Sequence, residues 1–206
     1  MPTLTVSDSM QLLKRHGVPV VESVEVKNEH ELKAACRKLR YPIAMKIVSE
    51  KLSHKTDKGG VRLNIDSLAK AKRALHDFRK MPGFQSAMLQ KQLAGREIII
   101  GGKFDDQFGH TILFGLGGVL VEVIKDFSIR ICPITRKDAK KMIAEIKGYP
   151  ILAGVRGQKP INFHELEEIL LKTAEMLEKE NIRELDINPL IATPEKIVAV
   201  DCRAII

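Results

Sequence analysis

The chain has 206 residues, 44% apolar and 29% charged, which is the composition of a globular protein long enough to bury a proper core. No apolar run approaches the roughly 20 residues of a membrane span. The N-terminus lacks the pattern of a signal peptide, so we expect a cytoplasmic protein. The three cysteines share no metal-ligand spacing, and Cys36 and Cys202 are expected to be small core residues.

The formal net charge of +8 suggests a nucleic-acid partner, because basic surfaces bind phosphate backbones. The lysines, however, are spread along helical segments beside acidic residues, and the chain has no Trp and only two Tyr for base stacking. Solvated helix faces explain most of the charge. A nucleic-acid-binding protein therefore remains only an alternative.

The expected elements alternate between helix and strand. In the first half we expect helices over 7–16 (capped by Ser7 or Asp8), 28–39 and 67–80, and strands over 18–26, 43–48 and 60–65. In the second half we expect strands over 87–92, 96–104, 111–114 and 119–124, helices over 137–146 and 164–180, and a closing hairpin. Several hairpins, one of them around Gly95, argue against an all-parallel sheet. The pattern predicts an α+β protein whose two lobes divide near residues 85–95.

The closing hairpin gathers polar residues on one face. A four-residue turn over 193–196 puts Asn188 opposite Asp201 and Asp186 opposite Arg203, while the intervening apolar residues face the core. Oxygen ligands on such a platform suit Mg²⁺ carried in with a nucleotide, because Mg²⁺ takes one or two protein oxygens plus phosphates. A solvated strand face with a surface salt bridge explains the same pattern.

Other polar residues stand in apolar strands or glycine-rich loops. Lys46 lies in a strand that is apolar on both faces, where an ammonium group needs an anion unless it reaches solvent at an edge. Glu97 and Glu122 raise the same question. The loop of residues 53–61 joins basic side chains to Gly59 and Gly60, whose backbone can approach phosphate oxygens. Each of these signals is weak alone, because a glycine pair is also common in plain turns and a lone histidine is often a surface residue.

The order of these features resembles that of a known family. The motifs are the lysine strand, His54-Lys55-Thr56-Asp57-x-Gly59-Gly60-Val61, the Gly-x-Glu strand, the Phe-Gly-x-Gly-Gly loop, residues 126–133 and Leu185-Asp186-Ile187-Asn188-Pro189-Leu190. In this order they resemble the ATP-grasp β subunits of the nucleoside-diphosphate-forming acyl-CoA synthetases, relatives of succinyl-CoA synthetase. The match is best to the β subunits of ADP-forming acetate–CoA ligases and covers residues 7–201.

The resemblance implies a two-lobed ATP-grasp fold with nucleotide bound between the lobes. The smaller N-terminal lobe would span residues 18–88, and the larger lobe would span 89–206 with helix 7–16 packed on it. The implied reaction converts acyl-CoA, ADP and phosphate into acid, CoA and ATP. It requires an α subunit with the CoA site and a phosphohistidine, in a heterotetramer of two α and two β subunits. Neither nucleic acid nor membrane is an expected partner.

Site residues follow from the same resemblance. His54 would be a second phosphorylated histidine, Asp186 would orient the phosphohistidine ring, and Asn188 and Asp201 would bind Mg²⁺. Residues expected to bind ATP or ADP are Lys46, Lys55, Gly59, Gly60, Gln90, Gln92, Leu93, Glu97 and Arg130. Within this set, residues 90–93 form the adenine hinge, and Arg130 would meet phosphate or the partner's loop.

Two residues depart from the family pattern. Lys91 stands in the hinge where relatives carry an acid, and Lys58 stands where they carry a small or apolar residue. Neither departure removes a residue assigned to chemistry. An alternative is a degenerate ATP-grasp module in a fused acyltransferase, but the intact His54, Asp186 and Asp201 argue against it. The acid substrate and the choice between ADP and GDP are not encoded in these residues.

Overall fold

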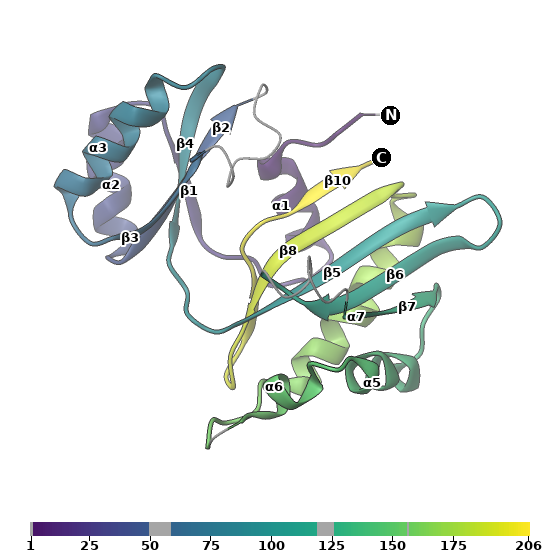
Figure 1. Cartoon of the computed structure of the whole chain (residues 1–206). Helices are drawn as coiled ribbons and strands as arrows, with labels where there is room; N and C mark the ends of the chain where they lie inside the picture. Colours follow the sequence, from purple (N-terminus) through teal and green to yellow (C-terminus); the bar gives the residue numbers. More distant parts are fainter. Residues whose placement is uncertain (1, 50–58, 119–125, 156) are drawn as a thin grey trace. The chain divides into compact units, whose positions relative to one another are not determined.

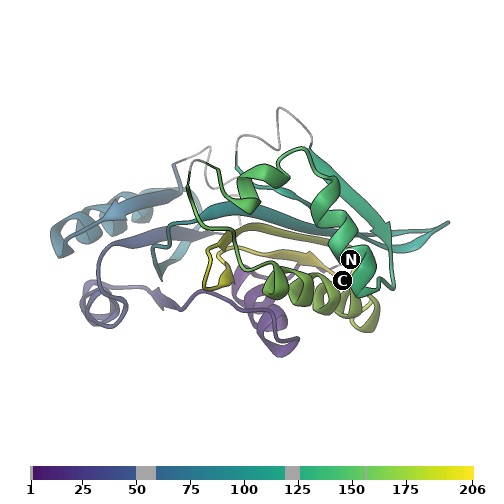
Figure 2. The same cartoon turned by 90° about the horizontal axis from the view of Figure 1, so that it is seen from below.

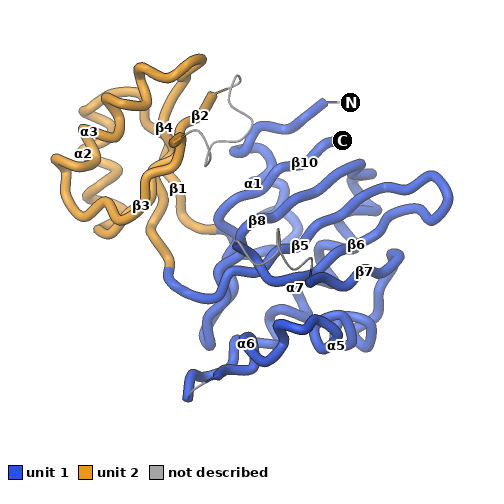
Figure 3. Tube along the Cα trace, viewed as in Figure 1, with its two compact units in different colours: residues 1–20, 94–206 blue, residues 21–93 orange. Residues whose placement is uncertain are grey.

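The structure is a computed structural model that describes residues 2–49, 59–118, 126–155 and 157–206 (Figures 1 and 2). It divides into two compact units, shown in different colours in Figure 3. Unit 2 is Val21–Leu93, and unit 1 is Met1–Val20 with Ala94–Ile206. The divisions therefore follow residues 20 and 93, where the sequence placed lobe boundaries near 18 and 88.

Unit 2 contains a four-stranded antiparallel sheet in the order β1-β4-β2-β3. Its strands are β1 (Ser23–Val26), β2 (Ile43–Ser49), β3 (Val61–Ile65) and β4 (Phe84–Lys91). The helices α2 (Glu29–Leu39) and α3 (Leu68–Arg79) pack against the sheet (Figure 1). Each helix begins after a polar cap, since the side chains of Asn28 and Ser67 accept backbone N–H groups three residues ahead.

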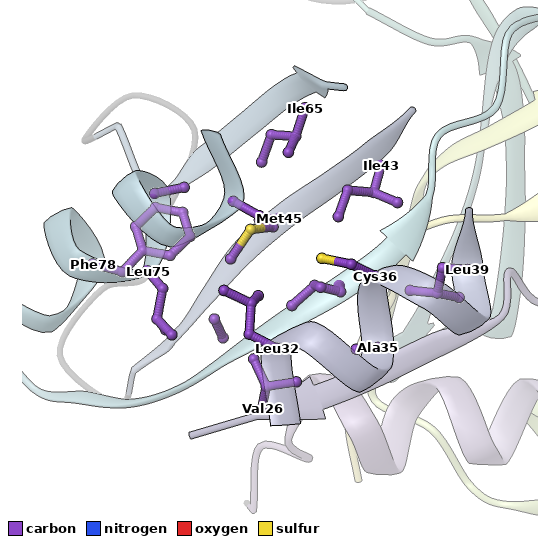
Figure 4. Packing of buried hydrophobic residues seen from close by; sticks show 14 of the residues in the cluster. Val26, Leu32, Ala35, Cys36, Leu39, Ile43, Met45, Ile65, Leu75 and Phe78 are labelled. Carbon is purple, nitrogen blue, oxygen red and sulfur yellow. The ribbon is translucent and has the colours of Figure 1, made fainter. Parts of the chain in front are cut away.

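A hydrophobic core lies between this sheet and its helices, as Figure 4 shows. Every second residue of β2 points into this core, namely Ile43, Met45 and Ile47. There they pack with helix residues such as Leu32 and Phe78. The strand period of two sends Ala44, Lys46 and Val48 to the opposite face.

Unit 1 contains a six-stranded antiparallel sheet in the order β10-β8-β5-β6-β7, with β9 also paired to β8. Its strands are β5 (Arg96–Asp105), β6 (Gly109–Leu116), β7 (Phe127–Ile131), β8 (Glu184–Ala192), β9 (Ile197–Ala199) and β10 (Arg203–Ile205). The helices are α1 (Val6–Arg15), α5 (Arg136–Glu145), α6 (Tyr149–Ala153) and α7 (Phe163–Lys179).

Helices cover one face of this sheet and leave the other open (Figure 2). On the covered face, a Cβ placed on Gly102 would lie 2.5 Å from the Leu177 side chain of α7, and Ser128 donates to the Met142 carbonyl of α5. Within the described part of unit 1, no helix packs on the opposite face. We call this opposite surface, which includes Gly101 and Asp186, the open face.

Most expected elements are present, with local corrections. The N-cap of α1 is Thr5 instead of Ser7 or Asp8, because the Thr5 hydroxyl accepts the Asp8 N–H and Asp8 lies in the first turn. The strand expected over 18–26 begins only at Ser23, since Val20 forms an isolated bridge with Ala199. The short helix α6 was not expected.

Gly95 is not the centre of a hairpin, because β4 and β5 belong to different sheets. A Cβ at Gly95 would lie 2.7 Å from the Ala192 carbonyl oxygen, so close packing against β8 explains this glycine. The strand expected over 119–124 falls outside the described residues.

All three cysteines are buried free thiols, which confirms the core positions predicted for Cys36 and Cys202. Among the described helices, none combines the length and the apolar character that crossing a membrane requires.

Candidate functional site

The hairpin register predicted from the sequence is confirmed. Arg203 of β10 pairs with Asp186, and Ala199 of β9 pairs with Leu190. The two pairings share one register, which sets Asn188 opposite Asp201 although residues 200–202 form no strand. Between them the Val200 N–H donates to the Pro189 carbonyl at 3.0 Å.

Alternation along β8 separates core from site. Leu185 and Ile187 are buried, whereas Asp186 and Asn188 are exposed on the open face. The pairing of β8 with β5 shifts between Ile98 and Ile100, so that Asn188 and Pro189 together face one residue of β5. Such a bulge redirects side chains, and bulges are common beside functional sites.

The acidic residues of the hairpin influence one another. Desolvation by surrounding protein raises the pKa of the Asp186 carboxyl, although its side chain reaches solvent. The charge of Asp201 raises this pKa further, and the Arg203 guanidinium lowers it. Burial, followed by the charges of Asp201 and Asp186, also raises the pKa of the Cys202 thiol, which keeps that thiol protonated. Asp186 therefore lies within electrostatic reach of both Asp201 and Arg203.

The donor set at the hairpin fits Mg²⁺. Asn188 supplies an amide oxygen and Asp201 a carboxylate, both of the hard type that this ion prefers, and Mg²⁺ completes its shell with water and phosphate oxygens. In the described ranges, no three His, Cys, Asp or Glu side chains form a group able to hold a metal ion. A site of few protein oxygens suits a metal that arrives with a nucleotide.

Lys46 and Gln90 of unit 2 share the sheet face that points away from α2 and α3. Lys46 pairs with Met88 and Ala44 pairs with Gln90, so the two polar side chains are diagonal neighbours on β2 and β4. Lys46 is 8% exposed, and Gln90 is fully buried. Of the two alternatives left open for Lys46, the edge-strand one is therefore wrong, because β2 pairs with β3 on one side and β4 on the other.

Gly60 lies against the same strand, because its carbonyl accepts the Ile47 N–H at 2.8 Å. Gly59 has a φ of +69°, a conformation that favours glycine, and its carbonyl accepts a hydrogen bond from the Arg62 guanidinium. The structure thus brings Gly59 and Gly60 next to Lys46. His54, Lys55 and Lys58 lie outside the described residues.

Two side chains of the predicted adenine hinge, those of Lys91 and Gln92, form hydrogen bonds within unit 2. Gln92 exchanges two hydrogen bonds with Asn64, one from the Asn64 N–H at 2.6 Å and one to its side-chain oxygen at 2.8 Å. Lys91 donates to the carbonyls of Arg40 and Tyr41 at the end of α2, a place where a cation is favourable. A structural role therefore explains Lys91. The Gln92 N–H donates to the Pro42 carbonyl at 3.1 Å, so the hinge groups that can meet a base are the Gln92 carbonyl and the backbone of the half-buried Leu93.

Glu97 of β5 is exposed and lies against the Gly117-Gly118 pair of unit 1. The Gly117 N–H donates to the Glu97 carbonyl at 2.7 Å, and a Cβ on Gly118 would lie 2.9 Å from the Glu97 carboxylate. Close packing against Glu97 thus accounts for these two glycines. Glu122 lies outside the described residues.

Arg130 does not join the hairpin residues. Its side chain lies on the covered face of the sheet and forms an ion pair with Glu145 of α5 at 2.5 Å, which lowers the pKa of Glu145. In the same motif, the Asp126 carboxylate accepts the N–H groups of Lys147 and Gly148. Both residues therefore fasten α5 and the segment after it.

An open depression of about 560 Å³ lies at the start of β5 in unit 1. Its lining comprises Ala94–Arg96, Gln158, Lys159 and residues 192–195, and none of these was predicted to belong to the site.

Comparisons with known proteins agree with this architecture. The ATP-grasp domain family matches residues 2–206. The chain is 41% identical to subunit beta of ADP-forming acetate–CoA ligase I from Pyrococcus furiosus, over 97% of this chain and 90% of that subunit.

Two solved structures of the dinucleotide-forming acetyl-coenzyme A synthetase 1 from Ca. Korarchaeum cryptofilum are also similar. The one with coenzyme A and Ca-AMPCP superposes with a TM-score of 0.92 at 36% identity, covering 99% of this chain and 93% of that chain. The one with coenzyme A and Mg-AMPPCP has a phosphohistidine segment pointing towards the nucleotide binding site. It gives a TM-score of 0.87 at 34% identity, with 99% and 92% coverage. The chain therefore belongs to the ATP-grasp family, in the branch of the β subunits of ADP-forming acetate–CoA ligases.

Proposed function

We propose that this chain binds Mg-ADP and Mg-ATP and transfers a phosphoryl group between nucleotide and histidine, as the β subunit of an ADP-forming acetate–CoA ligase. The overall reaction converts acetyl-CoA, ADP and phosphate into acetate, CoA and ATP. The observation that carries the proposal is the hairpin register, which gathers Asp186, Asn188 and Asp201 on the open face.

Residues of both units serve the nucleotide in this proposal. Lys46 neutralises phosphate charge, and the backbone of Gly59 and Gly60 donates to phosphate oxygens, with help from Lys55. Backbone groups of residues 90–93 recognise the base, and Glu97 accepts hydrogen bonds from the ribose. The burial of Lys46 supports its role, because a desolvated ammonium gains from an anion. For Arg130 the ion pair with Glu145 favours a structural role.

Asn188 and Asp201 are the proposed Mg²⁺ ligands. When bound, the ion neutralises charge on the nucleotide phosphates and fixes their orientation. Phosphoryl transfer consists mainly of positioning and charge neutralisation, so the residues around the phosphates supply most of the catalysis.

His54 is the proposed acceptor of the phosphoryl group in this chain, and Asp186 accepts the N–H of a phosphohistidine ring. An imidazole titrates near neutrality, so it acts as a nucleophile in one direction and as a leaving group in the other. The phosphohistidine segment directed at the nucleotide site of the Korarchaeum enzyme supports this arrangement.

The α subunit of this proposal supplies the CoA and acid sites and the first phosphohistidine, in a heterotetramer of two α and two β subunits. The name of the Pyrococcus relative, a subunit beta, supports such a partner. Since ADP and CoA thioesters are metabolites of the cell interior, we place the reaction in the cytoplasm.

Calorimetry of the isolated chain tests the nucleotide site. We expect ADP and ATP to bind one to one with Mg²⁺, and to bind far more weakly once EDTA has removed the metal. Asp201→Ala should lower Mg-ADP affinity roughly tenfold or more, because a charged ligand is lost. Glu184→Gln, which alters an exposed acid on the same face of β8, should bind like the wild type. Metal-independent binding, or preferential binding of duplex DNA, would contradict the proposal.

A further inference from the structure

Arg203 lies on the open face of unit 1, in the edge strand β10, directly across from Asp186. The neighbouring pair, Ala204 and Leu185, is buried on the covered face. Strand alternation therefore sends both Arg203 and Asp186 to the open face, where the Arg203 side chain is exposed. The sequence analysis places Arg203 on this face without assigning it a role.

The Arg203 guanidinium is not held in place by the described residues, although its charge lowers the pKa of Asp186. Among the described residues it donates no hydrogen bond and has no carboxylate oxygen within 4.0 Å. Arg130 and Arg136 of the same unit are instead held by acidic side chains of helices. An arginine without a salt bridge is ordinary on a protein surface. What distinguishes Arg203 is its position beside the proposed metal ligands.

The Arg203–Asp186 pair follows the Asn188–Asp201 pair along the hairpin, two residues further on. Two residues of antiparallel strand span roughly 7 Å. A phosphoryl group that leaves a nucleotide at Asn188 and Asp201 for an imidazole at Asp186 crosses this interval. An arginine side chain in β10 reaches along it.

Charge balance requires a cation at this point. Asp186 and Asp201 both repel the oxygens of a phosphoryl group, and Arg203 stands beside them on the same face. The guanidinium fork donates two parallel hydrogen bonds to two oxygens of one phosphate, which an ammonium group cannot reproduce. We propose that Arg203 is a catalytic residue that binds the phosphoryl group while this group passes between nucleotide and histidine. This inference rests on the proposed function.

The step balances without any further reactant. In the ATP-consuming direction, the lone pair of a neutral imidazole nitrogen forms a bond to the γ-phosphorus. The bond from this phosphorus to the β–γ bridging oxygen breaks, and its electron pair leaves with ADP. The second ring nitrogen keeps its proton and donates it in a hydrogen bond to Asp186. Arg203 donates N–H groups to the non-bridging oxygens throughout.

Single-turnover transfer from radiolabelled ATP to histidine, in the complex with the α subunit, tests this role. Arg203→Gln should slow transfer about 10²–10³-fold, the usual effect of removing one donor aimed at developing charge. Arg203→Lys should recover only part of the rate, because it keeps the charge and loses the fork. The Kd for Mg-ADP should stay near the wild-type value in both variants. Lys103→Gln, which removes another exposed cation from the open face, should transfer at the wild-type rate.

Transfer by Arg203→Gln at the wild-type rate would overturn the inference and leave the proposed function intact. Equal slowing in Arg203→Gln and Lys103→Gln would also overturn it, because it would indicate a general charge effect. A wild-type complex that binds no Mg-nucleotide and forms no phosphohistidine would overturn the proposed function itself, and this inference with it. Arg203→Lys keeps the test valid if Arg203→Gln does not fold.

Discussion

Lys46 illustrates how a single residue combines stability with function. It is 8% exposed in the middle of β2, between Met45 and Ile47, which belong to the core of unit 2. Burial of an ammonium group opposes folding unless anionic or polar groups surround it. Under the proposed function, the nucleotide phosphates place an anion beside this ammonium group.

Replacing Lys46 with Met tests this attribution. Methionine nearly matches the length of the side chain and removes the charge, so the variant should still fold while the phosphate contact is lost. Loss of a charged hydrogen bond, worth about 1.5–3 kcal/mol, should weaken Mg-ADP binding roughly 10- to 100-fold in calorimetry. Lys72→Met, which removes an exposed lysine paired with Glu29, should leave binding unchanged. Wild-type affinity in Lys46→Met would refute the phosphate contact.

At this scale the sequence predicts what depends on neighbours along the chain. The shared face of Asp186 and Asn188, and the place of Lys46 on the face of β2 opposite the core, follow from the period of two in a strand. The engagement of Gln92 by Asn64, and of Lys91 by the end of α2, depends on segments that meet only in the folded chain. No local sequence pattern predicts hydrogen bonds of this kind.

Among the elements, the closing hairpin was predictable because its turn and its alternation lie within one short segment. The prediction of a hairpin around Gly95 was wrong. Strands adjacent in sequence usually pair, but β4 pairs with β1 and β2 within unit 2. The short helix α6 has only five residues, too few for a periodic pattern.

Two adjacent glycines of β5 allow a matched test of sheet packing. A Cβ on Gly102 would lie 2.5 Å from the buried Leu177 of α7, whereas a Cβ on Gly101 meets nothing closer than 3.5 Å. Gly102→Ala should therefore lower the free energy of unfolding by about 1–3 kcal/mol through overpacking. Gly101→Ala should leave it unchanged or raise it by up to about 1 kcal/mol. Denaturant unfolding measures both, and equal stability of the two variants would contradict the assignment of the covered face.

For the whole molecule, the sequence predicted two lobes because the composition allows more than one small core and the strands fall into two groups. The structure gives unit 2 a core of its own, built on Phe78 and its neighbours, and a separate sheet order to each unit. The division lies at Leu93 because Ala94 already belongs to the segment that leads into β5. Which residues bury one another across a whole unit is a non-local property, so the expected boundary was only approximate.

As a whole molecule, the chain is expected to be a catalyst that needs both a partner subunit and a histidine relay. The most direct test is ATP formation from acetyl-CoA, ADP and phosphate by the complex of this chain with its α subunit. The wild-type complex should form ATP, and His54→Asn should abolish ATP formation while Mg-ADP binding stays nearly intact, since Asn offers no imidazole to phosphorylate. Undiminished ATP formation by His54→Asn would contradict the relay, and a wild-type complex that forms no ATP would contradict the proposed function.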